Sequence, residues 1–132
     1  MLVVAAACRD DNGRWLLHRR PAGKDYAGLW EYPGGKVEPG ETVRAAVVRE
    51  MHEESGLHLD PGSLEEAGFA VSEDAAWGRG IVLLLYRCTR WSGALDAKEG
   101  GIFQWFHPGE VAALAMPPLD RLLTRQMFEK SD

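Results

Sequence analysis

The chain has 132 residues, of which 45% are hydrophobic and 27% are charged, and its formal net charge at pH 7 is −5. This length and composition predict one globular domain over residues 1–132, with a substantial core. The acidic balance disfavours a basic surface that holds DNA or RNA, so we expect no nucleic-acid polymer as a partner. The apolar stretch at residues 1–7 is too short for a membrane span or a signal peptide, which predicts a cytoplasmic protein without a membrane partner.

Hydrophobic runs in the first part of the chain predict a hairpin. The runs Leu2–Arg9 and Trp15–Arg20 flank the turn sequence Asp11-Asn12-Gly13, which is typical of two strands joined by a tight turn. A loop over residues 21–28 follows.

The middle of the chain predicts a loop, a helix and a second loop. Pro39-Gly40 turns the chain, Glu41-Thr42 opens a helix and Gly56 ends it, because glycine is favoured just past a helix C-terminus.

The last half of the chain alternates strands, loops and helices. We expect strands over residues 64–71, 80–91 and 102–107, a loop over 72–79, and helices over 108–114 and 120–130. Asp120 is predicted as the N-cap of the last helix. This order of elements indicates an α/β or α+β sandwich.

Two cysteines, Cys8 and Cys88, lie in or beside apolar runs. They lack the spacing of metal ligands, so we expect both to be reduced thiols in the core. A catalytic thiol is not expected.

Three glutamates in the central helix form an acidic cluster. Glu50, Glu53 and Glu54 stand at i, i+3 and i+4, so their carboxylates share one face of the helix. Mg²⁺ prefers oxygen ligands, usually one or two carboxylates with waters and substrate phosphates. The cluster therefore predicts a Mg²⁺ site, with Mn²⁺ as a substitute, and a phosphorylated substrate.

The alternative interpretation is a solvated helix surface with ion pairs. On a wheel of about 100° per residue, Val43, Val47, Glu50 and Glu54 fall on one stripe. Buried carboxylates need neutralisation, and this favours metal binding.

Together these residues resemble the Nudix motif, in which a glycine precedes a glutamate and a run of Arg-Glu-aliphatic-x-Glu-Glu-x-Gly-aliphatic. No specified position departs from the motif, which covers residues 35–57. The matching residues are Gly35, Glu41, Arg49, Glu50, Met51, Glu53, Glu54, Gly56 and Leu57. The resemblance implies the Nudix fold, a mixed β-sheet between α-helices with a loop-helix-loop catalytic motif.

Segments outside the motif resemble the MutT-type nucleoside triphosphate pyrophosphohydrolases. These are Arg19-Arg20-Pro21-Ala22, residues 27–38 and Lys98-Glu99-Gly100. This resemblance implies that metal is held by the Gly34 carbonyl, Glu50, Glu53, Glu54 and Glu99, while Glu41 is structural. It also implies substrate-binding roles for Arg20, Tyr32, Gly34, Gly35, Lys36 and Asp120.

The implied reaction is attack of metal-activated water on the triphosphate, which releases a nucleoside monophosphate and pyrophosphate. Glu50 is the first candidate for the general base, and Glu53 and Glu99 are alternatives. Arg49 is expected to orient Glu50 or a neighbour; the alternative is a surface ion pair.

Recognition of the nucleotide base is expected to depend on Asp120. This residue stands where MutT enzymes that select oxidised guanine carry asparagine. An ionised carboxylate only accepts hydrogen bonds, which suits the amino group of cytosine or the N1–H and N2–H edge of guanine. Helix capping alone is the alternative role. Among four tryptophans that could stack on a base, Trp77 is the best candidate.

Three hypotheses follow. The first is hydrolysis of 8-oxo-dGTP or a related nucleotide in nucleotide-pool sanitation. The second is the same chemistry on CTP or 5-methyl-dCTP, and the third is a Nudix module that binds nucleotides without turnover. A monomer and a homodimer are both compatible with the sequence.

Overall fold

The computed structural model describes residues 1–73 and 80–128. Residues 74–79, which include Trp77, lie outside this description, as do residues 129–132. The strands are β1 (Leu2–Cys8), β2 (Trp15–Arg19), β3 (Trp30–Glu31), β4 (Gly34–Lys36), β5 (His58–Leu59), β6 (Glu65–Ser72), β7 (Ile81–Cys88), β8 (Trp91–Ser92) and β9 (Ile102–Phe106). The helices are α1 (Val43–Ser55), α2 (Pro108–Ala113) and α3 (Pro118–Phe128), with a short 3₁₀ turn over Pro61–Ser63.

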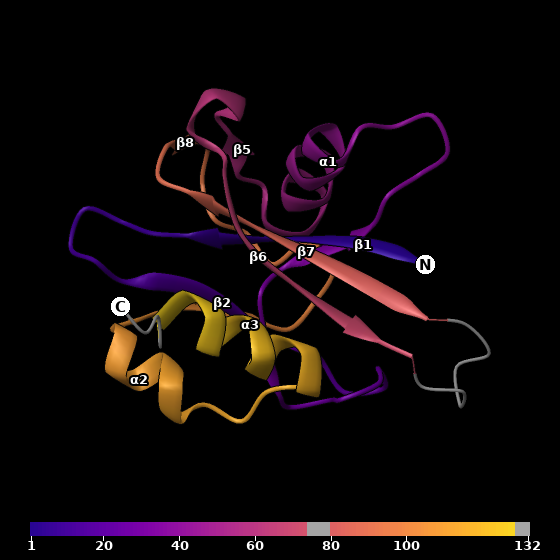
Figure 1. The fold of residues 1–132 in the computed structure, drawn as a ribbon. Helices are drawn as coiled ribbons and strands as arrows, with labels where there is room; N and C mark the ends of the chain where they lie inside the picture. Colours follow the sequence, from indigo (N-terminus) through magenta and orange to yellow (C-terminus); the bar gives the residue numbers. More distant parts are fainter. Residues whose placement is uncertain (74–79, 129–132) are drawn as a thin grey trace.

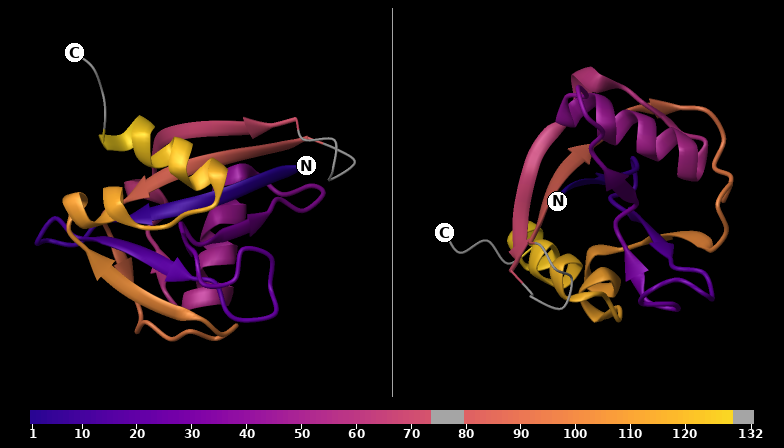
Figure 2. Two further views of the ribbon diagram at one scale, coloured as in Figure 1. Left: turned by 90° about the horizontal axis from the view of Figure 1, so that it is seen from below. Right: turned by 90° about the vertical axis from the view of Figure 1, so that its right-hand side faces the viewer.

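A mixed four-stranded sheet forms the centre of the molecule, in the order β4-β1-β7-β6. Strand β1 runs parallel to β7 and antiparallel to β4, while β6 is antiparallel to β7. Helix α1 covers one face of this sheet, and α2 and α3 lie on the other side (Figures 1 and 2). The predicted fold class, a mixed sheet between helices, is confirmed.

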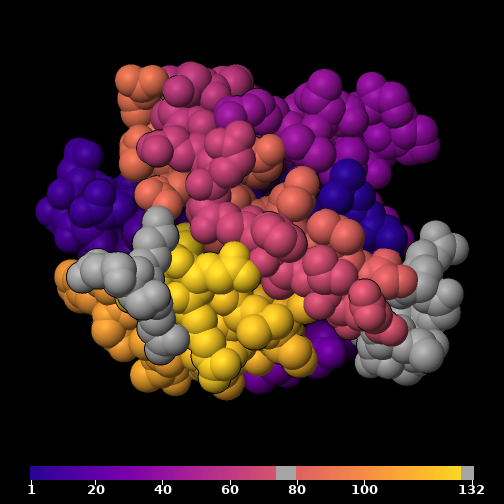
Figure 3. All heavy atoms as spheres, in the orientation of Figure 1, coloured from indigo at the N-terminus to yellow at the C-terminus, as the bar shows by residue number. Residues whose placement is uncertain are grey.

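Two core clusters fill the space on the two sides of the sheet. One packs the α1 residues Ala46, Val47 and Met51 against the sheet. The other packs α3 and α2, through Leu123 and Val111, against the opposite face. In the space-filling view α3 lies directly against β6 (Figure 3).

The predicted hairpin is wrong in its pairing. Among the described residues, the ladder between the two predicted strands is limited to the bridge between Arg9, which directly follows β1, and Trp15 of β2. The strands then enter different sheets, because β2 pairs with β3 and β9. Ala5 and Ala7 of β1 and Leu17 of β2 are buried in the same core cluster, so the two strands share a core instead of pairing along their length.

The motif helix begins and ends as predicted. Thr42 is the N-cap of α1 and accepts a hydrogen bond from the Ala45 N–H, and Gly56 ends the helix with a left-handed φ of 79°. The buried stripe consists of Ala46, Val47, Met51 and Ser55. It is shifted from the predicted stripe, so Glu50 and Glu54 flank the buried side chains.

Asp120 is not the N-cap of the last helix. Helix α3 begins at Pro118, two residues earlier than predicted, because proline is well suited to the first position of a helix. Asp120 therefore lies in the first turn, where it is buried. Its Oδ1 accepts a hydrogen bond from the Tyr32 N–H at 3.0 Å.

Other expectations concern the predicted strands and the cysteines. The predicted strand over residues 80–91 ends at Cys88, and Trp91 belongs to the separate strand β8. Cys8 and Cys88 are free and buried, as predicted. Among the helices of the described segments, none has the length and hydrophobicity needed to cross a membrane.

Candidate active site

A cavity of about 700 Å³ lies between the N-terminal part of the chain and α1. Strands β2, β3 and β4, helix α1 and the loop before β9 all contribute to its lining. The lining residues are His18, Arg20, Pro21, Lys24, Glu31, Gly34, Gly35, Lys36, Glu38, Glu50, Glu54 and Glu99. The structure thus brings together seven of the residues expected at the site, which are Arg20, Gly34, Gly35, Lys36, Glu50, Glu54 and Glu99.

Glu54 is the most deeply placed carboxylate of the cavity. Its Oε2 is buried and has no hydrogen-bond partner among the described residues. Burial raises the pKa of Glu54 to about 8, and the neighbouring carboxylate of Glu31 adds to this rise. A buried carboxylate oxygen without a partner is costly, so this position favours a cation.

Glu50 lies beside Glu54 and is mostly covered, with 16% of its side chain exposed. Burial raises the pKa of Glu50 in spite of its hydrogen bond to Arg49, and the charges of Glu53 and Glu99 act in the same direction as burial. Three carboxylates therefore influence one another at this point.

Arg49 connects the carboxylates at the rim of the site. Its guanidinium donates to both carboxylate oxygens of Glu41, at 2.7 and 2.9 Å, and to Glu50 Oε1 at 2.8 Å. It also contacts Glu53 Oε2 at 3.2 Å and the Lys36 carbonyl at 3.0 Å. These bonds hold the carboxylates of Glu41 and Glu50 against Arg49. The orienting role of Arg49 and the structural role of Glu41 stay predictions.

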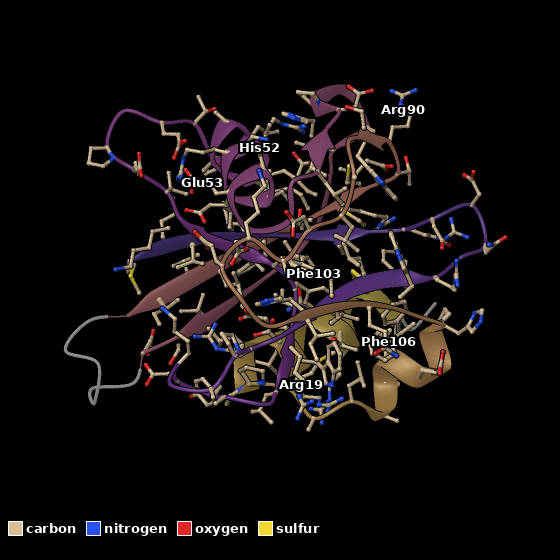
Figure 4. All side chains as sticks on the ribbon, turned by 180° about the vertical axis from the view of Figure 1, so that it is seen from behind. Arg19, His52, Glu53, Arg90, Phe103 and Phe106 are labelled. Carbon is tan, nitrogen blue, oxygen red and sulfur yellow. The ribbon has the colours of Figure 1, made fainter. Side chains whose placement is uncertain are left out.

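Glu53 is more exposed than the other two motif glutamates, with 48% of its side chain accessible. It projects from α1 (Figure 4) and does not line the cavity. The role of Glu53 as a metal ligand or general base remains a prediction. To bind a cation, the Glu53 carboxylate would have to leave its contact with Arg49.

Two glycines of β4 allow the close approach of their neighbours. A Cβ on Gly34 would lie 1.9 Å from the carbonyl oxygen of Val4, and a Cβ on Gly35 would lie 2.3 Å from Glu50 Oε2. Gly34 is thus required for the pairing of β4 with β1, and Gly35 gives space to the Glu50 carboxylate.

Five lining residues were not predicted from the sequence: His18, Pro21, Lys24, Glu31 and Glu38. Two of them contact each other, since His18 Nδ1 lies 3.2 Å from Glu31 Oε2, and Arg20 Nη1 donates to Glu31 Oε1 at 2.8 Å. The available signal for His18 was its two-residue spacing from Arg20 in the strand predicted over residues 15–20, which places the two side chains on the same face. Burial alone would lower the pKa of His18, but its bonds to Glu31 and to the Gly100 carbonyl outweigh burial and raise it.

A second cavity of about 460 Å³ adjoins the first, and Arg20, Glu31 and Lys36 line both. Its other walls are largely apolar, formed by Tyr26, Ile81, Leu83 and residues 117–119, and Asp120 lies among them. Burial raises the pKa of Asp120 to about 7, although the Tyr32 N–H lowers it.

Tyr32 lies in the core rather than in the lining of either cavity. Its hydroxyl is 2.7 Å from Thr124 Oγ1, and its backbone N–H holds Asp120. Any effect of Tyr32 on a substrate would therefore pass through Asp120.

The donor set fits a hard divalent cation. Carboxylates and backbone carbonyls offer only oxygen ligands, and the buried Oε2 of Glu54 has no other partner within the described segments. In residues 1–73 and 80–128 no three His, Cys, Asp or Glu side chains already stand in a ligating arrangement. Cation binding would thus draw in side chains such as Glu53 that now contact Arg49.

Comparisons with known proteins identify the family. The NUDIX domain model matches residues 1–129. The chain is 38% identical to the CTP pyrophosphohydrolase of Escherichia coli over 120 residues, which cover 91% of this chain and 86% of that protein. It is 34% identical to the 8-oxo-dGTP diphosphatase of the same organism, over 88% of this chain and 87% of that protein.

The fold shows the same relationship. The solution structure of the E. coli ORF135 protein superposes with a TM-score of 0.84 at 37% identity, covering 97% of this chain and 88% of that one. The motif, the fold and the extent of these matches agree, and the chain belongs to the Nudix hydrolases of the MutT-like type.

Proposed function

We propose that this chain is a Mg²⁺-dependent nucleoside triphosphate pyrophosphohydrolase, which forms a nucleoside monophosphate and pyrophosphate. The observation that carries the proposal is the pair of adjoining cavities. One contains the carboxylates Glu50, Glu54 and Glu99 together with the cations Arg20 and Lys36, and the other is largely apolar. A polyphosphate fits the first, and a base fits the second.

The bound cation would supply charge neutralisation for the phosphates and would lower the pKa of the attacking water. Glu50, Glu53, Glu54, Glu99 and the Gly34 carbonyl are the candidate ligands. Arg20 and Lys36 line both cavities, so they are placed to contact the phosphates next to the nucleoside. Glu50 remains our first candidate for the base that accepts the proton of water, with Glu53 and Glu99 as alternatives.

Asp120 is the candidate residue for recognition of the base. Its carboxylate accepts a hydrogen bond from the Tyr32 N–H through Oδ1, and Asp120 lines the second cavity. In its ionised form this carboxylate would accept from the N1–H and N2–H edge of guanine or from the amino group of cytosine. We propose 8-oxo-dGTP, or a related nucleotide, as the substrate in nucleotide-pool sanitation.

A second candidate substrate class is CTP and 5-methyl-dCTP. Two observations favour it: the carboxylate of Asp120 takes the place of an amide, and the relative with 38% identity is a CTP pyrophosphohydrolase. Both candidates use the same catalytic residues and differ only in the base.

The test is a comparison of kcat/KM with Mg²⁺ for 8-oxo-dGTP, dGTP, CTP, 5-methyl-dCTP and ADP-ribose. Preference for 8-oxo-dGTP supports the first candidate, and preference for a cytosine nucleotide supports the second. Preference for ADP-ribose would contradict the proposed substrate class. Failure to hydrolyse any of the five would contradict the proposal and favour a nucleotide-binding module.

In the same assay, Asp120→Asn should lower kcat/KM for a cytosine nucleotide by about 10-fold or more, because the amide can turn its N–H₂ donor toward the amino group that the carboxylate would accept from. The loss should not extend to 8-oxo-dGTP, whose recognition in MutT enzymes uses asparagine at this place. Inorganic triphosphate serves as the control substrate because it has no base. An equal loss with triphosphate would show that Asp120 does not act on the base.

A further inference from the structure

His18 is a buried imidazole whose two nitrogens both face acceptors. Nε2 lies 2.9 Å from the Gly100 carbonyl oxygen, and Nδ1 lies 3.2 Å from Glu31 Oε2. A carbonyl can only accept, so the bond to Gly100 requires a proton on Nε2. Glu31 lies beside the other ring nitrogen, and the two contacts together fix the orientation of the imidazole.

The contact with Gly100 matters because Gly100 directly follows Glu99. On the other side of Glu99, the Lys98 N–H donates to the Glu54 carbonyl at 3.1 Å, and the Asp96 N–H donates to the Ser55 carbonyl at 2.8 Å. The loop is thus held to the end of α1 before Glu99 by backbone hydrogen bonds. After Glu99, the side chain of His18 bonds to the Gly100 carbonyl, and the backbone pairing of β9 with β2 begins at Ile102.

The surroundings of His18 fix the direction of its ring. The ring packs on Phe103 of the neighbouring strand β9, with centroids 4.5 Å apart; Phe103 is labelled in Figure 4. Gly101 has a φ of 79°, and a Cβ there would lie 2.4 Å from His18 Nε2. The absence of a side chain at Gly101 therefore lets the ring reach the Gly100 carbonyl.

Glu31 connects His18 to Arg20, and both Glu31 and Arg20 line the two cavities. Its two oxygens are divided between His18 and Arg20. One carboxylate thus contacts both the candidate phosphate-binding arginine and the imidazole of His18, which bonds to the loop of Glu99.

We propose that His18 is a positioning residue that holds Glu99 at the metal-binding carboxylates through its hydrogen bond to the Gly100 carbonyl. This inference rests on the proposed function, in which Glu99 is a metal ligand. In this proposal His18 acts through the Gly100 carbonyl and is not itself a ligand of the cation. A residue that orients a ligand in this way changes metal affinity when it is replaced, by about 10–100-fold in known sites.

Two substitutions separate the two hydrogen bonds of His18. In His18→Gln the amide nitrogen takes the place of Nε2 and can still donate to the Gly100 carbonyl. In His18→Asn the amide nitrogen takes the place of Nδ1, so the bond to Glu31 is retained and the bond to Gly100 is lost. His58→Asn is the matched control, because His58 is exposed on β5 and lies outside both cavities.

The measurements are the dissociation constant of Mn²⁺ without nucleotide, by electron paramagnetic resonance, and kcat and KM with Mg²⁺. We expect His18→Asn to weaken Mn²⁺ binding by about 10-fold and to lower kcat by a similar factor with little change in KM. His18→Gln should stay within about 3-fold of the wild type, and His58→Asn should be unchanged.

Equal behaviour of the Asn and Gln variants in Mn²⁺ binding would overturn the proposal. An unfolded Asn variant beside a folded, fully active Gln variant would also overturn it, because the contact would then serve the fold. If the wild-type protein binds Mn²⁺ but hydrolyses no nucleotide, the proposed function is contradicted and the role of His18 is not. The Mn²⁺ affinities of the two His18 variants then decide that role.

Discussion

Replacing Gly35 with alanine tests how closely strand β4 must approach the carboxylate of Glu50. An added Cβ would lie 2.3 Å from Glu50 Oε2, 2.4 Å from Cδ and 2.7 Å from Oε1. Ordinary contact begins at 3.4 Å, so the carboxylate must withdraw by about 1 Å, and a misplacement of this size can lower a rate by about 100-fold. We therefore expect kcat to fall by about 100-fold, which corresponds to about 3 kcal/mol in activation free energy.

The fold should survive this change, because the obstructed atoms belong to the end of a flexible side chain. Gly34→Ala provides the contrast, since its Cβ would lie 1.9 Å from the backbone oxygen of Val4 and would disrupt the pairing of β4 with β1. Gly109→Ala is the matched control, because its Cβ meets no atom within 4 Å.

The assay is kcat with Mg²⁺ and a nucleoside triphosphate, together with thermal unfolding. We expect Gly35→Ala to be folded and nearly inactive, Gly34→Ala to be unstable, and Gly109→Ala to resemble the wild type. A Gly35→Ala variant with normal kcat would refute the assignment of the Glu50 carboxylate to the catalytic site.

Glu53→Gln should lower kcat by about 100-fold or more with the fold intact, as expected for loss of a ligand or base, and near-normal turnover in the same assay would exclude Glu53 from the site. Asp120→Asn should change the pH dependence of stability. Burial raises the pKa of Asp120 from 3.8 to about 7 in the folded protein. The protonated carboxyl therefore stabilises the fold fully below pH 4, and this contribution is lost as pH rises through 7. Chemical denaturation from pH 4 to 8 should therefore show a steeper decline for the wild type than for Asp120→Asn, and parallel curves would contradict the shift. Tyr32→Phe should destabilise the protein by about 1 kcal/mol, because the variant lacks the hydroxyl that bonds to Thr124. The ratio of kcat/KM between 8-oxo-dGTP and CTP should not change, since the backbone N–H that holds Asp120 is kept; a changed ratio would contradict a purely structural role of the hydroxyl.

Short-range patterns predicted the limits of helix α1 well, because its signals are local. Thr42 and Gly56 act as caps within one turn of the helix they delimit, and the spacing of Glu50 and Glu54 fixes their direction. The buried stripe of α1 was misplaced since it depends on which part of the helix faces the sheet.

Long-range pairing was harder to predict. The turn between β1 and β2 has the residues of a hairpin, yet the strands separate because each joins a different sheet. His18 and Glu31 were missed for a related reason: they meet through the pairing of β2 with β3, and no spacing along the chain marks it. Asp120 was assigned to the helix cap, but its partner Tyr32 is 88 residues away.

The most direct test of the central claim is the identity and metal dependence of the products. Wild-type protein is incubated with 8-oxo-dGTP or CTP, with Mg²⁺ or with EDTA, and the products are followed by ³¹P nuclear magnetic resonance. We expect nucleoside monophosphate and pyrophosphate to appear in equal amounts with Mg²⁺, and no turnover with EDTA. Release of inorganic phosphate with a nucleoside diphosphate, or equal rates with EDTA, would contradict the proposed site and its chemistry.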